Sequence, residues 1–251
     1  MNNFIYAFII SSLAGLSTLI GFLFIFIKPK KVNKFISISL SFSAIVMILI
    51  SIFDLIPESF FNLFFNYKIF GLIISIISFF IGIVLIKFSN KLLDNLKEKG
   101  SSLYKLGIIS AIVLMIHNIP EGVITFLTTG NDLGLGIKIA LAITLHNIPE
   151  GICIAVPIYY STKSIWKAFK TTLISGLSEP FGALLAYLFL SKFITTTILN
   201  IIFIVVAGIM ITLAIDEIIK ESIKYSEKNN SYIYIGLIIG IIFFVISMIF
   251  I

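Results

Sequence analysis

The sequence predicts an all-α membrane protein with eight transmembrane helices. Hydrophobic residues make up 59% of the 251-residue chain, and charged residues make up 12%, about half the usual share for a soluble domain. The mean hydropathy is +1.14, and apolar runs of spanning length recur between short polar segments. A spanning helix needs ~20 apolar residues, whereas the strands of a membrane barrel have ~10 residues of alternating polarity. The long runs therefore predict helices in lipid.

We expect the spans to form a single transmembrane domain that comprises residues 1–251. Their predicted bounds are about 4–27, 35–56, 69–90, 104–127, 135–160, 165–190, 197–219 and 231–251. The first run has no Lys before it and a Lys cluster after it, which is the reverse of a cleavable signal peptide. We therefore interpret it as a retained first span.

The lysines predict how the chain is oriented in a cell membrane. All eighteen basic residues are Lys, and fifteen of them lie in or beside the loops after the odd-numbered spans. The opposite side has Lys68, Lys138 and Lys192. Because cytoplasmic loops carry the excess of Lys, both termini are predicted to lie outside. A nucleic-acid partner is not expected, since the chain lacks Arg, the preferred bidentate reader of bases.

Ionisable residues inside the predicted spans are the strongest functional signal. A charged side chain at the bilayer centre costs ~2.5–3.5 kcal/mol on insertion scales, so it needs a role. Glu121, Glu150 and Glu179 fall within the fourth, fifth and sixth spans. The two histidines of the chain, His117 and His146, lie close to two of these acids in the sequence.

Those histidines belong to a repeated segment. His-Asn-Ile-Pro-Glu-Gly occupies residues 117–122 and recurs identically at 146–151. His and Glu are four residues apart and share one helix face, while Asn reaches to the side. Imidazole, amide and carboxylate groups are ligands for a borderline divalent metal. The proline in each copy is expected to kink its helix and to free a backbone carbonyl.

The fourth and fifth spans are antiparallel, so the two copies can meet near the middle of the membrane. Glu121 and Glu150 would then approach each other, and two such carboxylates cannot both stay ionised without a cation. Carboxylates in this position can bridge two metals. Glu179 is expected to add a further ligand. In the second span, Asp54 is either a ligand or a carboxylate lining the pathway, and Met47 is either a soft ligand or ordinary packing.

These residues resemble the ZIP (Zrt/Irt-like) family of divalent metal transporters, and most closely its bacterial ZupT/GufA-like branch. The doubled His-Asn-x-Pro-Glu-Gly and the segment Ser-Gly-Leu-Ser-Glu-Pro-Phe-Gly at 175–182 carry the resemblance. It implies a 3+2+3 arrangement in which spans 1–3 and 6–8 form an inverted repeat, and an elevator-like shift of one helix bundle. It also implies metal import through a binuclear site.

The resemblance assigns the ligands to two metal positions. It implies one position with His117, Glu121 and Glu150, with Met47 at its edge. The neighbouring position would be built from Asn118, Glu121, His146, Asn147, Glu150 and Glu179. Asp54 would be a polar gate or an accessory ligand. The loop between the third and fourth spans has no His, unlike that of many members, which argues against metal sensing by this loop.

The leading hypothesis is that the protein is a carrier and not an enzyme, and that it needs no cofactor. Its partners would be the lipid bilayer and the transported ion: zinc first, and also ferrous iron, manganese, cadmium or cobalt. A metal exporter, a metal/proton antiporter and a membrane metal sensor that does not transport stay open as alternatives. So does the oligomeric state, with a homodimer as one candidate. An intramembrane metallohydrolase is disfavoured because the chain lacks His-Glu-x-x-His.

Overall fold

The computed structural model describes residues 2–93, 101–189 and 195–250, and within these ranges every regular element is a helix. The predicted all-α class is confirmed. Lys192 and part of the lysine-rich loop after the third span lie outside the described residues. Seven described stretches are long and apolar enough to cross a membrane: Phe4–Phe26, Val32–Tyr67, Ile69–Ser89, Ser102–Asn131, Leu133–Thr162, Thr196–Tyr225 and Ser231–Ile249. The chain is therefore a multi-pass membrane protein.

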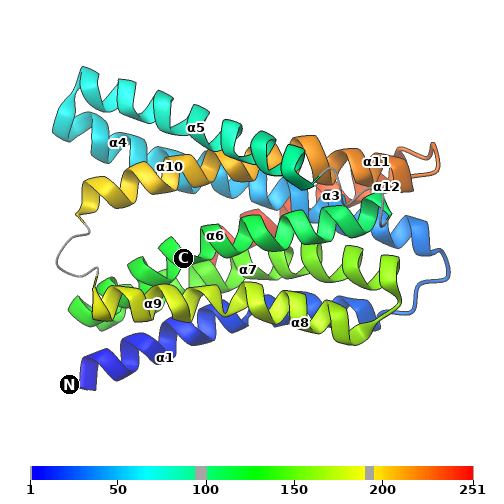
Figure 1. Cartoon of the computed structure of the whole chain (residues 1–251), viewed down its shortest axis with the longest axis horizontal. Coiled ribbons are helices and arrows are strands. Elements are labelled where there is room, and N and C mark those ends of the chain that lie inside the picture. The colour runs from blue at the N-terminus through cyan, green and yellow to red at the C-terminus, as the bar shows by residue number, and fades with distance from the viewer. Residues whose placement is uncertain (1, 94–100, 190–194, 251) are drawn as a thin grey trace.

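The predicted sixth span is divided into two helices. Helix α8 (Ile165–Gly176) and helix α9 (Ser178–Leu188) are separated at Leu177, so each is shorter than a spanning helix. Figure 1 shows them lying end to end beside α6 and α7. Pro180 lies in the first turn of α9, where a proline is tolerated because the first backbone N–H groups of a helix have no partner within it.

The predicted first span is divided in the same way. It consists of α1 (Asn2–Leu16), α2 (Thr18–Phe22) and the 3-10 turn η1 (Leu23–Phe26). The sequence Gly-Leu-Ser occurs at both breaks: residues 15–17 end at the break at Ser17, and residues 176–178 span the break at Leu177. The two breaks touch, because a Cβ atom on Gly176 would lie 2.6 Å from the Gly15 carbonyl oxygen. The absence of side chains at these glycines lets the two backbones meet.

The two helices with the repeated motif continue through their prolines. Helix α6 (Ser102–Asn131) contains Pro120, and helix α7 (Leu133–Thr162) contains Pro149. Irregular backbone occurs instead in two π-helical turns, a geometry that is frequent at functional sites. One turn, η2 (Ser51–Leu55), contains Asp54 and joins α3 (Val32–Ile50) to α4 (Ile56–Tyr67). The other, η5 (Ala214–Ile219), joins α10 (Thr196–Leu213) to α11 (Lys220–Tyr225).

The helices pack as two bundles. The first bundle contains α1, α2, α6, α7, α8 and α9, and the second contains α3, α4, α5 (Ile69–Leu93), α10, α11 and α12 (Ser231–Phe250). In Figure 1 the second bundle lies mostly above the first. The bundles meet mainly where α3 packs on α7, and there the Ser43 hydroxyl donates a hydrogen bond of 2.7 Å to the Pro149 carbonyl. The repeated motifs therefore lie beside the junction of the bundles.

Candidate metal-binding site

The two copies of the repeated motif meet between α6 and α7. The Nε2 atom of His117 lies 3.1 Å from Glu121 Oε1 on its own helix and 3.3 Å from Glu150 Oε1 on the neighbouring helix. The first contact follows from the four-residue spacing, which places His and Glu on one helix face. All three side chains are buried. An imidazole and two carboxylates thus share a small volume inside the first bundle.

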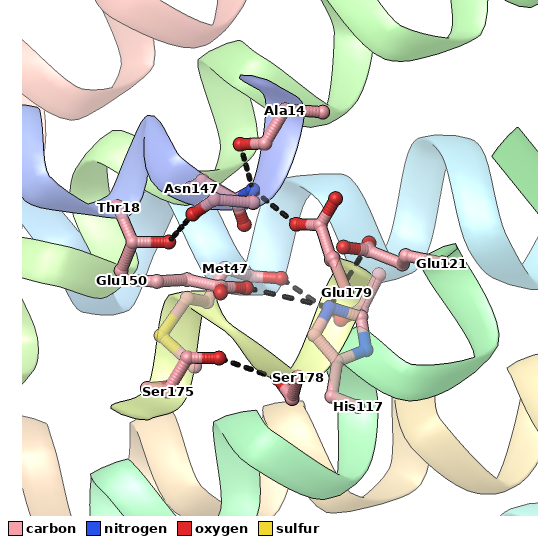
Figure 2. A network of polar contacts seen from close by, with 12 residues as sticks. Ala14, Thr18, Met47, His117, Glu121, Asn147, Glu150, Ser175, Ser178 and Glu179 are labelled. Atoms are coloured by element: carbon pink, nitrogen blue, oxygen red, sulfur yellow. Dashed lines mark hydrogen bonds and ion pairs between the residues drawn. The ribbon is translucent and has the colours of Figure 1, made fainter. Parts of the chain in front are cut away.

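A third carboxylate comes from the break in the predicted sixth span. Glu179 lies in the first turn of α9 and is fully buried. The amide nitrogen of Asn147 donates hydrogen bonds to Glu179 Oε1 and, at 2.8 Å, to the Ala14 carbonyl. Figure 2 shows Glu179 facing the same central space as His117, with Glu121 on one side of it. Asn147 therefore ties α7 to both broken helices and orients the third carboxylate.

Glycines in the motif allow the close approach of these helices. A Cβ atom on Gly122 would lie 2.8 Å from Glu179 Cα, and one on Gly151 would lie 2.9 Å from the carbonyl carbon of Thr18. Ordinary van der Waals contact begins at 3.4 Å. The last residue of each motif copy thus contacts the backbone of a broken helix. Gly122 on α6 contacts α9, and Gly151 on α7 contacts the break between α1 and α2.

Asn118 and His146 are also buried in this region. In the amide orientation that gives the nitrogen its partners, Asn118 Nδ2 donates hydrogen bonds of 2.7 Å to the Leu114 carbonyl and 3.3 Å to Glu150 Oε2. His146 lies within electrostatic range of Glu121. All seven predicted ligands of the fourth, fifth and sixth spans are therefore buried in the first bundle.

The two accessory residues come from the second bundle. Met47 on α3 is 1% exposed, and Figure 2 draws it among the residues of the polar network. Asp54, in the π-helical turn that follows, is half-buried and within electrostatic range of Glu58 and Glu121. The cluster is therefore bordered on the α3 side by a thioether and a carboxylate.

Several buried polar atoms of the cluster have no hydrogen-bond partner among the described residues. They are His117 Nδ1, Glu121 Oε2, Asn147 Oδ1, Glu150 Oε1 and Glu179 Oε2. Leaving such an atom unpaired costs about 1–3 kcal/mol, and native structures contain few of them. Within ranges 2–93, 101–189 and 195–250, no three His, Cys, Asp or Glu side chains are set out to hold a metal. Instead, His117 contacts both Glu121 and Glu150.

Two further residues beside the cluster were not predicted from the sequence. Thr125 follows Glu121 by four residues on α6, and Ser175 precedes Glu179 by four residues. Both are fully buried. The four-residue spacing from a buried acid could have identified them, but serines and threonines are common in this chain and most of them have local partners.

The fold and the cluster define the class of this protein: it is a multi-pass membrane protein with imidazole, amide and carboxylate groups buried between its helices. The family described as ZIP Zinc transporter matches residues 94–248. The Zinc transporter ZupT of Oceanobacillus iheyensis is 39% identical over 274 aligned residues, which cover 99% of this chain and 98% of that protein. The proteins of the same name from Streptococcus mutans and Clostridium perfringens are 37% and 36% identical, and the alignments cover 96% and 99% of this chain and 96% of each relative.

The chain belongs to the ZIP family. The family predicted from the doubled motif is thus confirmed, and the protein is a transporter, not an enzyme. The matches extend over nearly the whole chain, so they include both bundles and the cluster between α6, α7 and α9.

Proposed function

We propose that this protein imports Zn²⁺ across the cell membrane into the cytoplasm, and that the ion binds in the cluster of His117, Glu121, Glu150 and Glu179. The observation that carries the proposal is the buried contact of His117 with carboxylates from both motif copies, at 3.1 and 3.3 Å. Mixed nitrogen and oxygen donors suit zinc. They also accept ferrous iron, manganese, cadmium and cobalt to differing degrees.

The ligands are divided between two ion positions that share Glu121 and Glu150. One position uses His117, with Met47 at its edge. The other uses Asn118, Glu121, His146, Asn147, Glu150 and Glu179. The unpartnered Oε2 atom of Glu121 supports this division, because that carboxylate keeps a second oxygen for a bridge. The unpartnered Oε2 atom of Glu179 is available to the second ion alone. Paired metals in such sites lie ~3.5–4 Å apart.

The chain crosses the membrane eight times in a 3+2+3 arrangement, with α8 and α9 together forming the sixth crossing and with both termini outside. Similar packing on the two sides of the second bundle supports an inverted repeat, since α5 packs on α10 and α12 packs on α3. The sequence gives further support. One spacing occurs twice: a Met is followed by an acid seven residues later and by a Glu four residues after that. The first occurrence is Met47, Asp54 and Glu58, and the second is Met210, Glu217 and Glu221.

The distribution of ligands between the bundles supports transport by relative motion of the bundles. His117, Glu121, Glu150 and the other principal ligands belong to the first bundle, whereas Met47 and Asp54 belong to the second. A shift of the first bundle would carry the ions with it and leave Met47 and Asp54 in place. Asp54 then acts as a gate or accessory ligand in only part of the cycle.

Zinc uptake into proteoliposomes tests the proposal. Glu121→Ala and Glu150→Ala should abolish uptake, measured with a zinc-sensitive dye inside the vesicles, while elution in size-exclusion chromatography stays normal. Asp132→Asn is the control because it removes one negative charge from an exposed residue. Asp132 caps α7 by accepting a hydrogen bond of 3.0 Å from the Leu135 N–H, and Asn is an equally good cap. Normal uptake by both glutamate variants would overturn the proposal.

A further inference from the structure

Two fully buried hydroxyl groups lack a hydrogen-bond partner within the part of the chain that the structure describes: Thr125 Oγ1 and Ser175 Oγ. Other buried hydroxyls on helices of this protein have partners, and several donate to the carbonyl four residues earlier. Examples are Thr129 to Thr125 at 2.6 Å, Thr172 to Ala168 at 2.9 Å and Thr212 to Gly208 at 2.7 Å. An unpaired buried hydroxyl costs about 1–3 kcal/mol, so these two positions are the exceptions that need a reason.

Both residues are four positions from a carboxylate of the cluster, which is about one turn or ~6 Å along a helix axis. Thr125 follows Glu121 by four residues and His117 by eight, so the three share one face of α6. Ser175 precedes Glu179 by four residues, on the other side of the break at Leu177. Figure 2 shows Ser175 on the segment that leads into Glu179.

The two hydroxyls lie on opposite sides of the cluster along the membrane normal. Figure 1 shows α6 and the α8–α9 pair running in the same direction, from the end with residues 102 and 165 to the end with residues 131 and 188. In this direction Thr125 follows Glu121, whereas Ser175 precedes Glu179. In the orientation of the proposed function, Thr125 is on the outer side of the cluster and Ser175 is on the cytoplasmic side.

A divalent ion that enters a buried carboxylate cluster must exchange its water ligands for protein atoms. A neutral hydroxyl oxygen can replace one water without trapping the ion, and conduction requires sites weak enough to leave. We propose that Thr125 is the outer contact and Ser175 the inner contact of the transported ion, each replacing one water as the ion reaches or leaves the carboxylates. This inference rests on the proposed function, because it takes the cluster as the ion site.

Thr125→Val and Ser175→Ala test the inference by removing each hydroxyl with little change in shape. In proteoliposomes at equal pH on both sides, Vmax/KM must be the same in the two directions for a passive carrier. Thr125→Val should therefore raise the KM for outer zinc about tenfold at similar Vmax, a change of ~1.4 kcal/mol, and lower Vmax for efflux. Ser175→Ala should give the reverse pattern, with a lower Vmax for uptake and a raised KM for inner zinc.

Matched variants separate these effects from simple damage to packing. Thr129→Val and Thr172→Val remove buried hydroxyls that already have carbonyl partners, and both should keep wild-type KM in both directions. Thr125→Ser and Ser175→Thr retain the hydroxyl and should restore wild-type kinetics.

Wild-type kinetics in both directions for Thr125→Val and Ser175→Ala, together with a gain in thermal stability, would overturn the inference. That result would make the two hydroxyls unpaired packing groups without a role in transport. It would leave the proposed function intact as long as Glu121→Ala still abolishes uptake. Normal uptake by both Glu121→Ala and Glu150→Ala would instead refute the ion site itself.

Discussion

Replacing Gly122 by Ala adds one methyl group where α6 touches the backbone of Glu179. The new Cβ atom would lie 2.8 Å from Glu179 Cα and 2.7 Å from its carbonyl carbon, whereas ordinary contact begins at 3.4 Å. The carbonyl oxygen of Glu179 would lie closer still, so helix α9 must move away by more than about 0.7 Å, since a close-packed interior has no spare room. The atoms in the way are backbone atoms, so no side-chain rotation relieves the overlap.

This displacement should damage transport more than it damages the fold. Overpacking of this kind costs about 1–3 kcal/mol, which is small beside the ~5–15 kcal/mol stability that is typical of folded proteins. A binding constellation, however, must be held within ~0.5 Å of its productive geometry, and the shift moves the Glu179 carboxylate by more than that. We expect zinc uptake by Gly122→Ala at low zinc concentration to fall at least about tenfold.

Gly130→Ala is the matched control on the same helix. No atom lies within 4 Å of the Cβ atom that this substitution would add. It should stabilise α6 by up to about 1 kcal/mol, because Ala has the higher helix propensity, and leave uptake unchanged. Both variants are measured by proteoliposome uptake and by thermal unfolding in detergent. Equal uptake by Gly122→Ala and Gly130→Ala would refute the reasoning.

Three other predictions follow from particular contacts. Asn147→Leu removes the donor to Glu179 and to the Ala14 carbonyl. It should weaken zinc binding, measured by calorimetry, about 10–100-fold, and wild-type affinity would contradict this role of Asn147. Cys153 is fully buried and donates a hydrogen bond of 3.2 Å to Ser110 Oγ. A maleimide should therefore label Cys153 at least about tenfold more slowly in the folded protein than in detergent-unfolded protein. Equal labelling rates would show that Cys153 is not buried. In a Cys153→Ser background, an impermeant maleimide applied to whole cells should label Lys138→Cys but not Lys167→Cys; the opposite result would invert the orientation.

Helix positions were largely predictable from the sequence because the bilayer sets the length of an apolar run. The fifth span was predicted at 135–160, and α7 comprises Leu133–Thr162. The breaks at Ser17 and Leu177 were not predicted, since Gly-Leu-Ser is apolar enough to continue a hydropathy run. They occur where the backbones at Gly15 and Gly176 meet. That contact joins residues far apart in the chain, and local patterns do not report it.

The candidate site was predictable to a similar degree. The repeated motif and the antiparallel spans predicted that the two copies would come together, and the structure brings His117 within 3.3 Å of Glu150. The sequence could not show that Asn147 donates to Glu179 and to the Ala14 carbonyl, because that depends on how α7 is rotated against both broken helices. Thr125 and Ser175 were missed for a related reason: only the structure distinguishes a buried hydroxyl with a local partner from one without.

The two broken helices show how a nearly symmetric scaffold holds an asymmetric site. Residues 15–21 read Gly-Leu-Ser-Thr-Leu-Ile-Gly, and residues 176–182 read Gly-Leu-Ser-Glu-Pro-Phe-Gly. The backbone of Thr18 rests on Gly151 just as the backbone of Glu179 rests on Gly122. Thr18 satisfies its hydroxyl by donating 2.6 Å to the Gly15 carbonyl, whereas Glu179 keeps an unpartnered oxygen.

This difference limits the negative charge of the cluster. A carboxylate at position 18 would add a fourth acid to a buried space, at a cost of ~2.5–3.5 kcal/mol on insertion scales when no cation compensates it. It would also hold a divalent ion more tightly, which opposes release. With Thr in that place, the second broken helix contributes backbone packing and no charge. Thr18→Glu should therefore bind zinc more tightly than the wild type while transporting it more slowly, and equal affinity would show that position 18 does not face the ion.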